Sequence, residues 1–324
     1  MRTAAIFLMA AMLGAGTPAS AQTAVDTRVV TLIVPYAPGG PSDVGARRLA
    51  PFLERELGQP VIVQNIAGAT GAIASQKVVD AAPDGLTLLY GSQNELVLVP
   101  ATNDSARYKP QDLACIGLVV TTPLVLVTHP DSPYRSADEM VSFLRGDPQR
   151  IATYGSPGTS SLQHVAGFAI ASLAHVNMIH VPYKGVAPMM TDLLGQQINV
   201  SATTLTGGTL DYIRSGRLRS LGVLSLHRTS LADDLPTINE GRVFKGVDFS
   251  SWGGIFVTAR APLSVQERLN DAVRRAMARP ELRAGIVANG GEPGHPMTLA
   301  QLAAFYGGES ARYAPIATNL RESR

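Results

Sequence analysis

Cysteine is almost absent from this sequence, and charged residues are few. Cys115 is the only cysteine, so no intramolecular disulfide can form and the fold must be stabilised by burial. We expect Cys115, in the run "LACIGLVV", to be a buried small apolar group. Charged residues make up 16% of the chain, and 27 basic residues nearly balance 25 acidic ones. This balance and the 6% content of aromatic residues exclude a nucleic-acid surface, which needs clustered positive charge and stacking rings.

No apolar run is long enough to span a membrane. The run over residues 4–16 is shorter than the roughly 20 residues that a membrane-spanning helix needs. A basic residue precedes it, and the small residues Ala19 and Ala21 follow it. This arrangement is typical of a secretory signal peptide. We therefore predict a signal peptide over residues 1–21 and a monomeric periplasmic protein that begins at Gln22.

The motifs of several enzyme classes are also missing. The sequence has no GxSxG nucleophile elbow, no HExxH metal motif, and neither the Walker A nor the GxGxxG pattern of nucleotide sites. Its six histidines show no metal-ligand spacing. We therefore expect no catalytic residue, no metal and no cofactor. The enzymatic alternative is an exported hydrolase that uses Ser156 or Ser160 with His164, a histidine that a structural role explains better.

Short apolar runs alternate with amphipathic helical patterns along the rest of the chain, which predicts an α/β fold with parallel sheets flanked by helices. The predicted strands are 31–34, 61–63, 86–90, 124–128, 151–154, 178–183, 198–202 and 218–224. The predicted helices are 43–57, 71–82, 161–174, 188–194 and 209–214, with a mainly helical tail from 262. With 324 residues the chain suits about two domains. We predict two lobes with a ligand cleft between them: lobe 1 over 22–123 and 251–324, and lobe 2 over 124–250.

The stretch "VPYAPGGPSD" joins the first predicted strand to the first predicted helix. Glycines at such a turn let a ligand approach the backbone, and the first amides of the helix have no partner within it. The turn therefore suits an anion cradle, although a plain tight turn capped by Ser42 or Asp43 is the alternative. The candidate ligand-binding residues here are Tyr36, Pro38, Gly39, Gly40, Ser42 and Asp43.

A similar arrangement recurs in the second lobe, where "TYGSPGTSSLQ" again runs from a strand through glycines and hydroxyl residues into a helix. Two amide-rich loops that face each other would clamp a small anion. The candidates in this loop are Ser156, Gly158, Thr159 and Ser160. Further candidates follow other strands: Ala69, Thr70, Ser92, Gln93 and Thr203.

These motifs resemble the Bug family, the extracytoplasmic solute-binding receptors of tripartite tricarboxylate transporters. Gly39, Gly40 and Asp43 fit the family's GGxxD turn, and Asn65, Gly68, Ala69 and Gly71 fit its NxxGAxG pattern. "APDGLTLL", "YGSPG" with His164, "VPYKG" and "PTINE" follow in the family's order. The resemblance implies a two-lobed periplasmic-binding fold of the type II class and a small carboxylate ligand held largely by main-chain amides and hydroxyls.

Some positions depart from the family's pattern. Ser160 and Val186 stand where glycines are common, Asn199 and Lys109 stand where aspartates are usual, and the loop "SQNELVLVPATN" differs throughout. The resemblance implies a receptor that delivers its ligand to membrane permease subunits. A sensor subunit that presents its loaded form to a signalling protein is the alternative, because the same cleft would serve both. An amide cradle recognises the carboxylate head alone, so the sequence leaves the rest of the ligand open.

Overall fold

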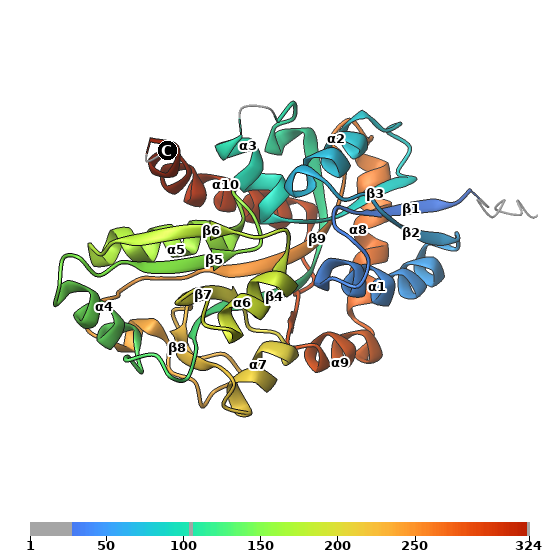
Figure 1. Ribbon diagram of the computed structural model, residues 1–324. Helices are drawn as coiled ribbons and strands as arrows, with labels where there is room; N and C mark the ends of the chain where they lie inside the picture. The colour runs from blue at the N-terminus through green and yellow to red at the C-terminus, as the bar shows by residue number, and fades with distance from the viewer. Residues whose placement is uncertain (1–27, 104–105, 323–324) are drawn as a thin grey trace, which may run out of the picture.

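One long strand, β4 (Leu113–Thr128), runs through the middle of the molecule and takes part in both of its sheets (Figure 1). The structure is a computed structural model that describes residues 28–103 and 106–322. Up to Pro123, β4 pairs antiparallel with β9 (Ser250–Thr258), and from Leu124 it pairs with β7 (Val200–Thr204). We call the halves built on these two sheets lobe 1 and lobe 2.

The change of partner within β4 falls at the predicted crossing between the lobes. The exact bounds, 22–123 with 251–324 and 124–250, stay a proposal. The predicted strand at 124–128 is only the end of β4, because the preceding apolar segment continues it from Leu113. The predicted signal peptide, 1–21, lies outside the described residues.

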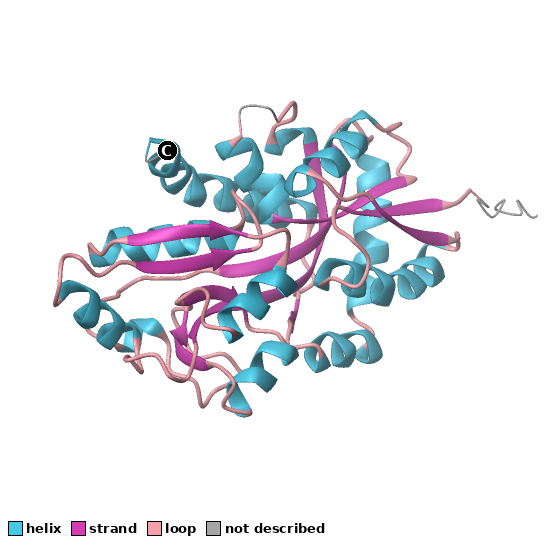
Figure 2. Ribbon diagram, in the orientation of Figure 1, coloured by secondary structure: helices cyan, strands magenta, loops and turns pink. Residues whose placement is uncertain are grey.

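In lobe 1 the strand order is β2–β1–β3–β9–β4. β1 (Val30–Val34) pairs parallel with β2 (Val61–Asn65) and β3 (Thr87–Ser92), whereas β3 pairs antiparallel with β9. Neighbouring residues of β1 point to opposite faces of the sheet. Leu32 packs in a cluster with α1 (Pro41–Leu57) and α8 (Leu263–Met277), and Ile33 packs in a cluster with α2 (Ala72–Asp80). Helices therefore cover both faces (Figure 2).

In lobe 2 three parallel strands are again joined to antiparallel ones. β5 (Ala152–Ser156) pairs parallel with β6 (Met178–Pro182) and β7, and both β7 and β8 (Arg219–Val223) pair antiparallel with β4. The helices of this lobe are α4 (Ala137–Arg145), α5 (Leu162–Ala174), α6 (Val186–Leu194) and α7 (Gly207–Arg214). Each sheet is thus mixed, because β9 in lobe 1 and β4 in lobe 2 pair antiparallel with their neighbours. Most strands of each sheet nevertheless run in one direction, as predicted.

The C-terminal segment packs back on lobe 1, as the predicted helical tail implies. It contains α8, α9 (Pro280–Ala288), β10 (Glu292–Pro293) and α10 (Leu299–Glu322). Glu56 on α1 accepts hydrogen bonds from Arg275 on α8 and from Arg279 next to α9. Within the described residues, none of the helices combines the length and apolar character that a membrane-spanning helix needs.

Local signals explain most of the predicted elements. Gly58 ends α1 in the left-handed conformation, at φ 67°, and Ser161 caps α5 by accepting a hydrogen bond from His164 N. Cys115 is buried, as predicted. The sequence prediction missed α4, β9 and the two short helical segments after β3, η2 (Asn94–Leu98) and α3 (Val99–Thr102). The other short helices are η1 (Ala69–Gly71), η3 (Pro110–Asp112) and η4 (Ile238–Glu240).

Candidate ligand-binding site

The glycine turn between β1 and α1 is fixed by one buried carboxylate, Asp43. This side chain accepts hydrogen bonds from Gly39 N at 2.9 Å, from Arg47 Nε at 3.0 Å and from Asn65 Nδ2 at 2.9 Å. Burial raises the pKa of Asp43, but the hydrogen bonds from Arg47, Gly39 and Asn65 outweigh it and lower the pKa overall. Asp43 therefore holds the turn in place, and the residue at the N-cap of α1 is Gly40.

The outer side of this turn is open to an approaching ligand. Pro38 and Gly39 are exposed, and Gly40 and Ser42 are half-buried. A Cβ atom at Gly39 would meet no atom within 4 Å, and one at Gly40 would meet only Ala37 O at 3.6 Å. Gly39 has φ 84°, which other residues rarely adopt, whereas Gly40 has φ −77°. Only position 39 therefore requires glycine for its conformation. A substitution at Gly40 can block the approach of a ligand without straining the backbone.

The side chains at the end of β3 are engaged within lobe 1. Gln93 is fully buried, accepts a hydrogen bond from Trp252 N at 3.0 Å and donates to Ser251 Oγ at 3.2 Å, so it fixes β3 to β9. Ser92 donates to the carboxylate of Glu95 from its hydroxyl, at 2.9 Å, and from its backbone N–H. Glu95, which the sequence reasoning missed, thus organises this part of the site.

Glu95 also accepts a hydrogen bond from the hydroxyl of Tyr36, which donates to Oε2 at 2.7 Å. Glu95 is 0% exposed. Burial raises its pKa to about 7, against the opposing effect of the hydrogen bonds from Tyr36 and Ser92. The only sequence signal for this arrangement is the departure of "SQNELVLVPATN" from the family's usual loop.

In lobe 2, two histidines hold the loop that follows β5. The hydroxyl of Ser156 donates to Gly158 O at 2.9 Å, so its oxygen is the acceptor for His180 Nε2, at 2.6 Å. Ser160, in the left-handed conformation with φ 67°, donates its backbone N–H to His164 Nδ1 at 3.2 Å. The two imidazole rings stack with their centroids 3.8 Å apart. The sequence prediction gave His164 a structural role but missed His180.

This geometry does not favour a serine nucleophile. Ser156 is 0% exposed, so its oxygen is out of reach of an external substrate. His164 bonds the backbone of Ser160 rather than its hydroxyl. Thr203, another predicted residue, is buried in β7, where it pairs with Val125 of β4. The buried hydroxyl of Ser156 therefore holds the loop in place, and the exposed Thr159 lies at the surface of the loop.

The loops of the two lobes meet in space. The hydroxyl of Thr70 in lobe 1 donates to Thr159 O in lobe 2 at 3.5 Å. Asn94 Oδ1 accepts a hydrogen bond at 2.9 Å from Leu162 N, the first residue of α5. Ala69 and Thr70 have positive φ values of 48° and 50°, which shape their turn toward this contact. Asn94, absent from the predicted set, thus joins the end of β3 to the second loop.

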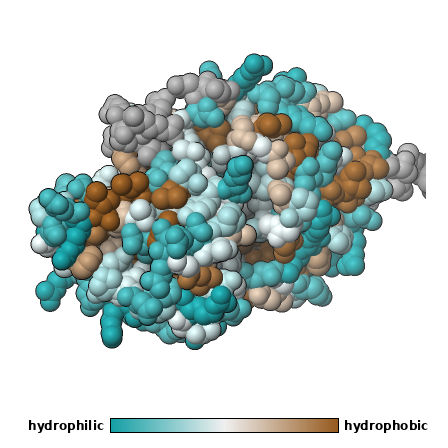
Figure 3. Space-filling view, in the orientation of Figure 1, coloured by the Kyte–Doolittle hydropathy of each residue, from teal (hydrophilic) through white to brown (hydrophobic). Residues whose placement is uncertain are grey.

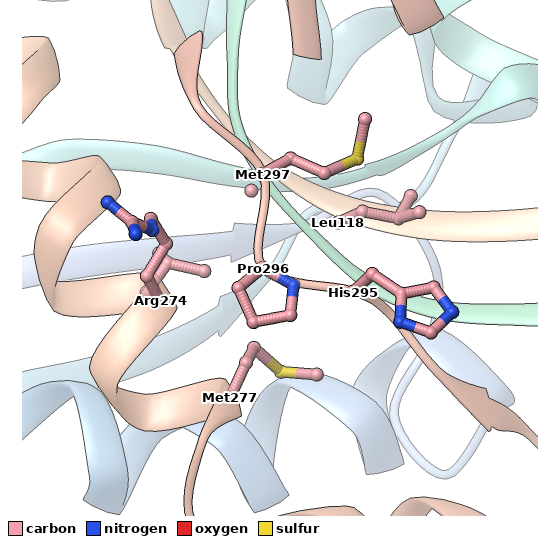
Figure 4. A pocket seen from close by; sticks show the side chains of 8 residues that line it. Leu118, Arg274, Met277, His295, Pro296 and Met297 are labelled. Atoms are coloured by element: carbon pink, nitrogen blue, oxygen red, sulfur yellow. The ribbon is translucent and has the colours of Figure 1, made fainter. Parts of the chain in front are cut away.

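Two surface hollows lie elsewhere. One, of about 10 Å³, lies between β4, α8 and the segment around Pro296, and Leu118, Arg274 and His295 are among the side chains in view (Figure 4). The other, of about 360 Å³, lies between α7 and α9. Neither is lined by a residue predicted for the site. Figure 3 shows a further feature, an apolar surface over β6, where Ile179 is exposed.

Known proteins resemble this chain over most of its length. The profile described as "Tripartite tricarboxylate transporter family receptor" matches residues 45–321. BugT of Bordetella pertussis is 37% identical over 241 residues, which cover 73% of this chain and 72% of BugT.

Solved structures share the fold. R. palustris Rpa4515 with adipate has a TM-score of 0.81 and 26% identity, over 90% of this chain and 97% of that chain. MatC from Rhodopseudomonas palustris with bound malate has a TM-score of 0.79 and 25% identity, over 90% of this chain and 99% of that chain. The predicted periplasmic-binding-protein fold is therefore confirmed. Because the family profile spans most of the sequence, this chain belongs to the tripartite tricarboxylate transporter receptor family, and its predicted resemblance to Bug proteins is confirmed.

Proposed function

We propose that this chain captures a small carboxylate between its two lobes in the periplasm and delivers it to permease subunits of a tripartite tricarboxylate-type transporter. The observation that carries this proposal is the meeting of two segments of lobe 1 with the segment of lobe 2 that leads into α5, through Thr70 with Thr159 and through Asn94 with Leu162. Malate and adipate in the two related structures support a carboxylate as the ligand.

Main-chain amides and hydroxyl groups would hold the ligand's carboxylate. We propose the predicted set as a whole, with two kinds of role. Exposed and half-buried positions of the loops contact the ligand, and buried side chains keep those loops in place. The set is Tyr36, Pro38, Gly39, Gly40, Ser42, Asp43, Ala69, Thr70, Ser92, Gln93, Ser156, Gly158, Thr159, Ser160 and Thr203.

The protein performs no chemistry on its ligand in this proposal. Lobe closure about β4 and β9 is favoured by the ligand only as far as it binds both lobes at once. We propose that the mature chain is a monomer exported by residues 1–21. A sensor subunit in a signalling system stays the alternative, since it would use the same loops.

A thermal-shift screen against monocarboxylates, dicarboxylates, tricarboxylates, amino acids and aromatic acids tests the binding step. An acid present at 100 times its dissociation constant should stabilise the folded state by about 2.7 kcal/mol. Hits are confirmed by calorimetry and incubated with the protein to look for products. Saturable binding of an acid that is recovered unchanged supports the receptor. Turnover that is lost in both Ser156→Ala and His180→Ala would make it an enzyme.

The partner is tested separately, by uptake of the identified acid into cells that lack this gene. The transporter proposal predicts that uptake is lost and that it returns with the wild-type gene. Unchanged uptake, with loss of a transcriptional response to the acid, would favour the sensor.

A further inference from the structure

Glu95 places a carboxylate inside the site that is proposed to receive one. It lies on η2, directly after β3, where three turns of lobe 1 converge. Tyr36, from the β1–α1 turn, donates to it at 2.7 Å, and Ser92, at the end of β3, donates at 2.9 Å. A Cβ atom at Gly71, before α2, would lie 2.8 Å from the Glu95 Cβ. The neighbouring Asn94 reaches lobe 2. Glu95 therefore lies behind the meeting point of the two loops.

This carboxylate engages hydrogen-bond donors that a ligand carboxylate would otherwise use. The hydroxyls of Tyr36 and Ser92 each carry one proton, and both protons point at Glu95, as does the Ser92 backbone N–H. Each hydroxyl oxygen also accepts a hydrogen bond from Asn94 at 3.4 Å, so toward a ligand it can offer only a remaining lone pair. A ligand carboxylate has no proton to give to such acceptors. A hydroxyl, an amide or an ammonium group does.

The charge of Glu95 is not balanced by a cation. Among the ion pairs of the described residues, Asp43 is paired with Arg47, but Glu95 has no such partner. The titratable groups that face Glu95 from other elements are the hydroxyls of Tyr36, Tyr108 and Tyr306. Burial raises the pKa of each of these hydroxyls, so they stay neutral. A second ligand carboxylate on this side would thus meet a like charge in a medium of low dielectric constant.

We propose that Glu95 is a specificity-determining residue: it makes the site prefer acids with one carboxylate and a neutral or cationic far end over dicarboxylates and tricarboxylates. This proposal rests on the proposed function, since it concerns the ligand of the same site. The carboxylate of Glu95 would repel the second carboxylate of an unwanted ligand, so the site discriminates by repulsion.

Matched pairs of acids test the proposal, because they differ only in one carboxylate. The probes are malate with malamate and adipate with adipamate, the second of each pair carrying an amide in place of one carboxylate. At pH 8.5, where Glu95 is ionised, calorimetry with wild-type protein should show about tenfold or greater preference for the monoacid. Glu95→Gln should reduce this preference to less than about threefold. Glu281→Gln, which alters an exposed carboxyl on α9, should leave it unchanged.

Wild-type protein provides a second arm that does not depend on how the variant folds. At pH 6 Glu95 is mostly protonated, because its pKa lies at about 7. The free acids stay largely ionised at that pH, since carboxyl groups titrate at roughly pH 4. The preference for the monoacid should therefore shrink between pH 8.5 and pH 6. A preference that does not change with pH would contradict the proposal.

The two proposals fail in different ways. Tighter binding of the diacid by wild-type protein, or equal discrimination by wild type and Glu95→Gln, overturns the role of Glu95 and leaves the receptor function intact. If no acid of either pair or of the wider screen binds at all, the receptor function itself fails, and the role of Glu95 with it.

Discussion

The two lobes hold their loops by different chemistry. In lobe 1, carboxylates do this: Asp43 accepts from Gly39 N, and Glu95 accepts from Tyr36 and Ser92. In lobe 2, imidazoles do it: His164 accepts from Ser160 N, and His180 bonds Ser156. Each side chain fixes a loop that carries predicted ligand-binding residues. A loop rich in glycine and hydroxyl groups is therefore not flexible by default, because buried acceptors determine which of its amides remain for a ligand.

The two carboxylates of lobe 1 also differ from each other. Hydrogen bonds lower the pKa of Asp43 despite its burial, whereas burial raises the pKa of Glu95 to about 7. Asp43 therefore favours the folded state when it is ionised, and Glu95 favours it when it is protonated. Their effects on stability must have opposite signs as the pH changes.

The largest expected effect is the pH dependence caused by Glu95. Its pKa is about 7 in the folded state and about 4.3 in an unfolded chain, so the folded state binds more protons between these values. Stability should fall as the pH rises through this window, by about 4 kcal/mol at most. Urea unfolding of wild type and Glu95→Gln at pH 4.5 and pH 8.5 measures the difference. If the free energy of unfolding changed with pH equally in the two proteins, ionisation of Glu95 would not destabilise the folded state.

Removal of Asp43 comes next. Asp43→Ala leaves Gly39 N without its acceptor and Asn65 Nδ2 with only Tyr36 O. The free energy of unfolding at pH 7 should drop by about 3 kcal/mol, since bonds to charged groups are the stronger ones. This contribution exists above the unfolded pKa of about 3.9 and should be lost as the pH falls through the lower folded value. Arg47→Ala is the control: its side chain is 53% exposed, so the loss should stay below about 1 kcal/mol. Equal losses for both variants would place the stabilisation in the ion pair.

In lobe 2, His164→Ala should lower the free energy of unfolding by about 2 kcal/mol, because the buried Ser160 N–H loses its acceptor. The exposed His227, changed to alanine, should have almost no effect. Urea unfolding of the two variants at pH 7 measures both. A loss in His164→Ala as small as that in the control would mean that the imidazole does not hold the loop.

The smallest effect concerns the contact between the lobes. Asn94→Ala removes the acceptor for Leu162 N at the start of α5 and should cost about 1 kcal/mol, as loss of a helix cap does. Thr70→Val removes a longer bond, 3.5 Å to Thr159 O, and should cost less. Unfolding of both variants without ligand measures which of them loses more free energy of unfolding. The reverse order would place the main contact at Thr70.

Local signals in the sequence were enough to locate most of the elements and the loops that carry the predicted site. The glycines at 39, 40 and 158 mark turns because backbone conformation is a local property, and Ser161 marks the start of α5 for the same reason. The missed helix α4 has such a signal too, since Ser136 accepts a hydrogen bond from Glu139 N. The first half of β4 was missed because its apolar run, interrupted by Gly117, has no clear alternation.

The roles within the site could not be read from the sequence in the same way. Glu95 and Tyr36 are 59 residues apart, and Ser156 and His180 are 24 residues apart. Each pair is brought together only when parallel strands lie side by side: Tyr36 and Glu95 follow the neighbouring strands β1 and β3, and Ser156 and His180 lie on the paired strands β5 and β6. The resemblance to a family supplied the loops but gave no role to Glu95, which lies where the loop departs from that family.

In the function that we propose, a small carboxylate binds at the amide turn of lobe 1. Titration calorimetry of Gly40→Val tests it most directly, with an acid that wild type binds, because the backbone at Gly40 accepts a side chain without strain. Gly307→Val on α10 is the matched control, since a Cβ atom there also meets nothing within 4 Å. We expect both variants to stay folded, with free energies of unfolding within about 1 kcal/mol of wild type, and only Gly40→Val to lose affinity, by about tenfold or more. Wild-type affinity in Gly40→Val would contradict it and make the turn purely structural.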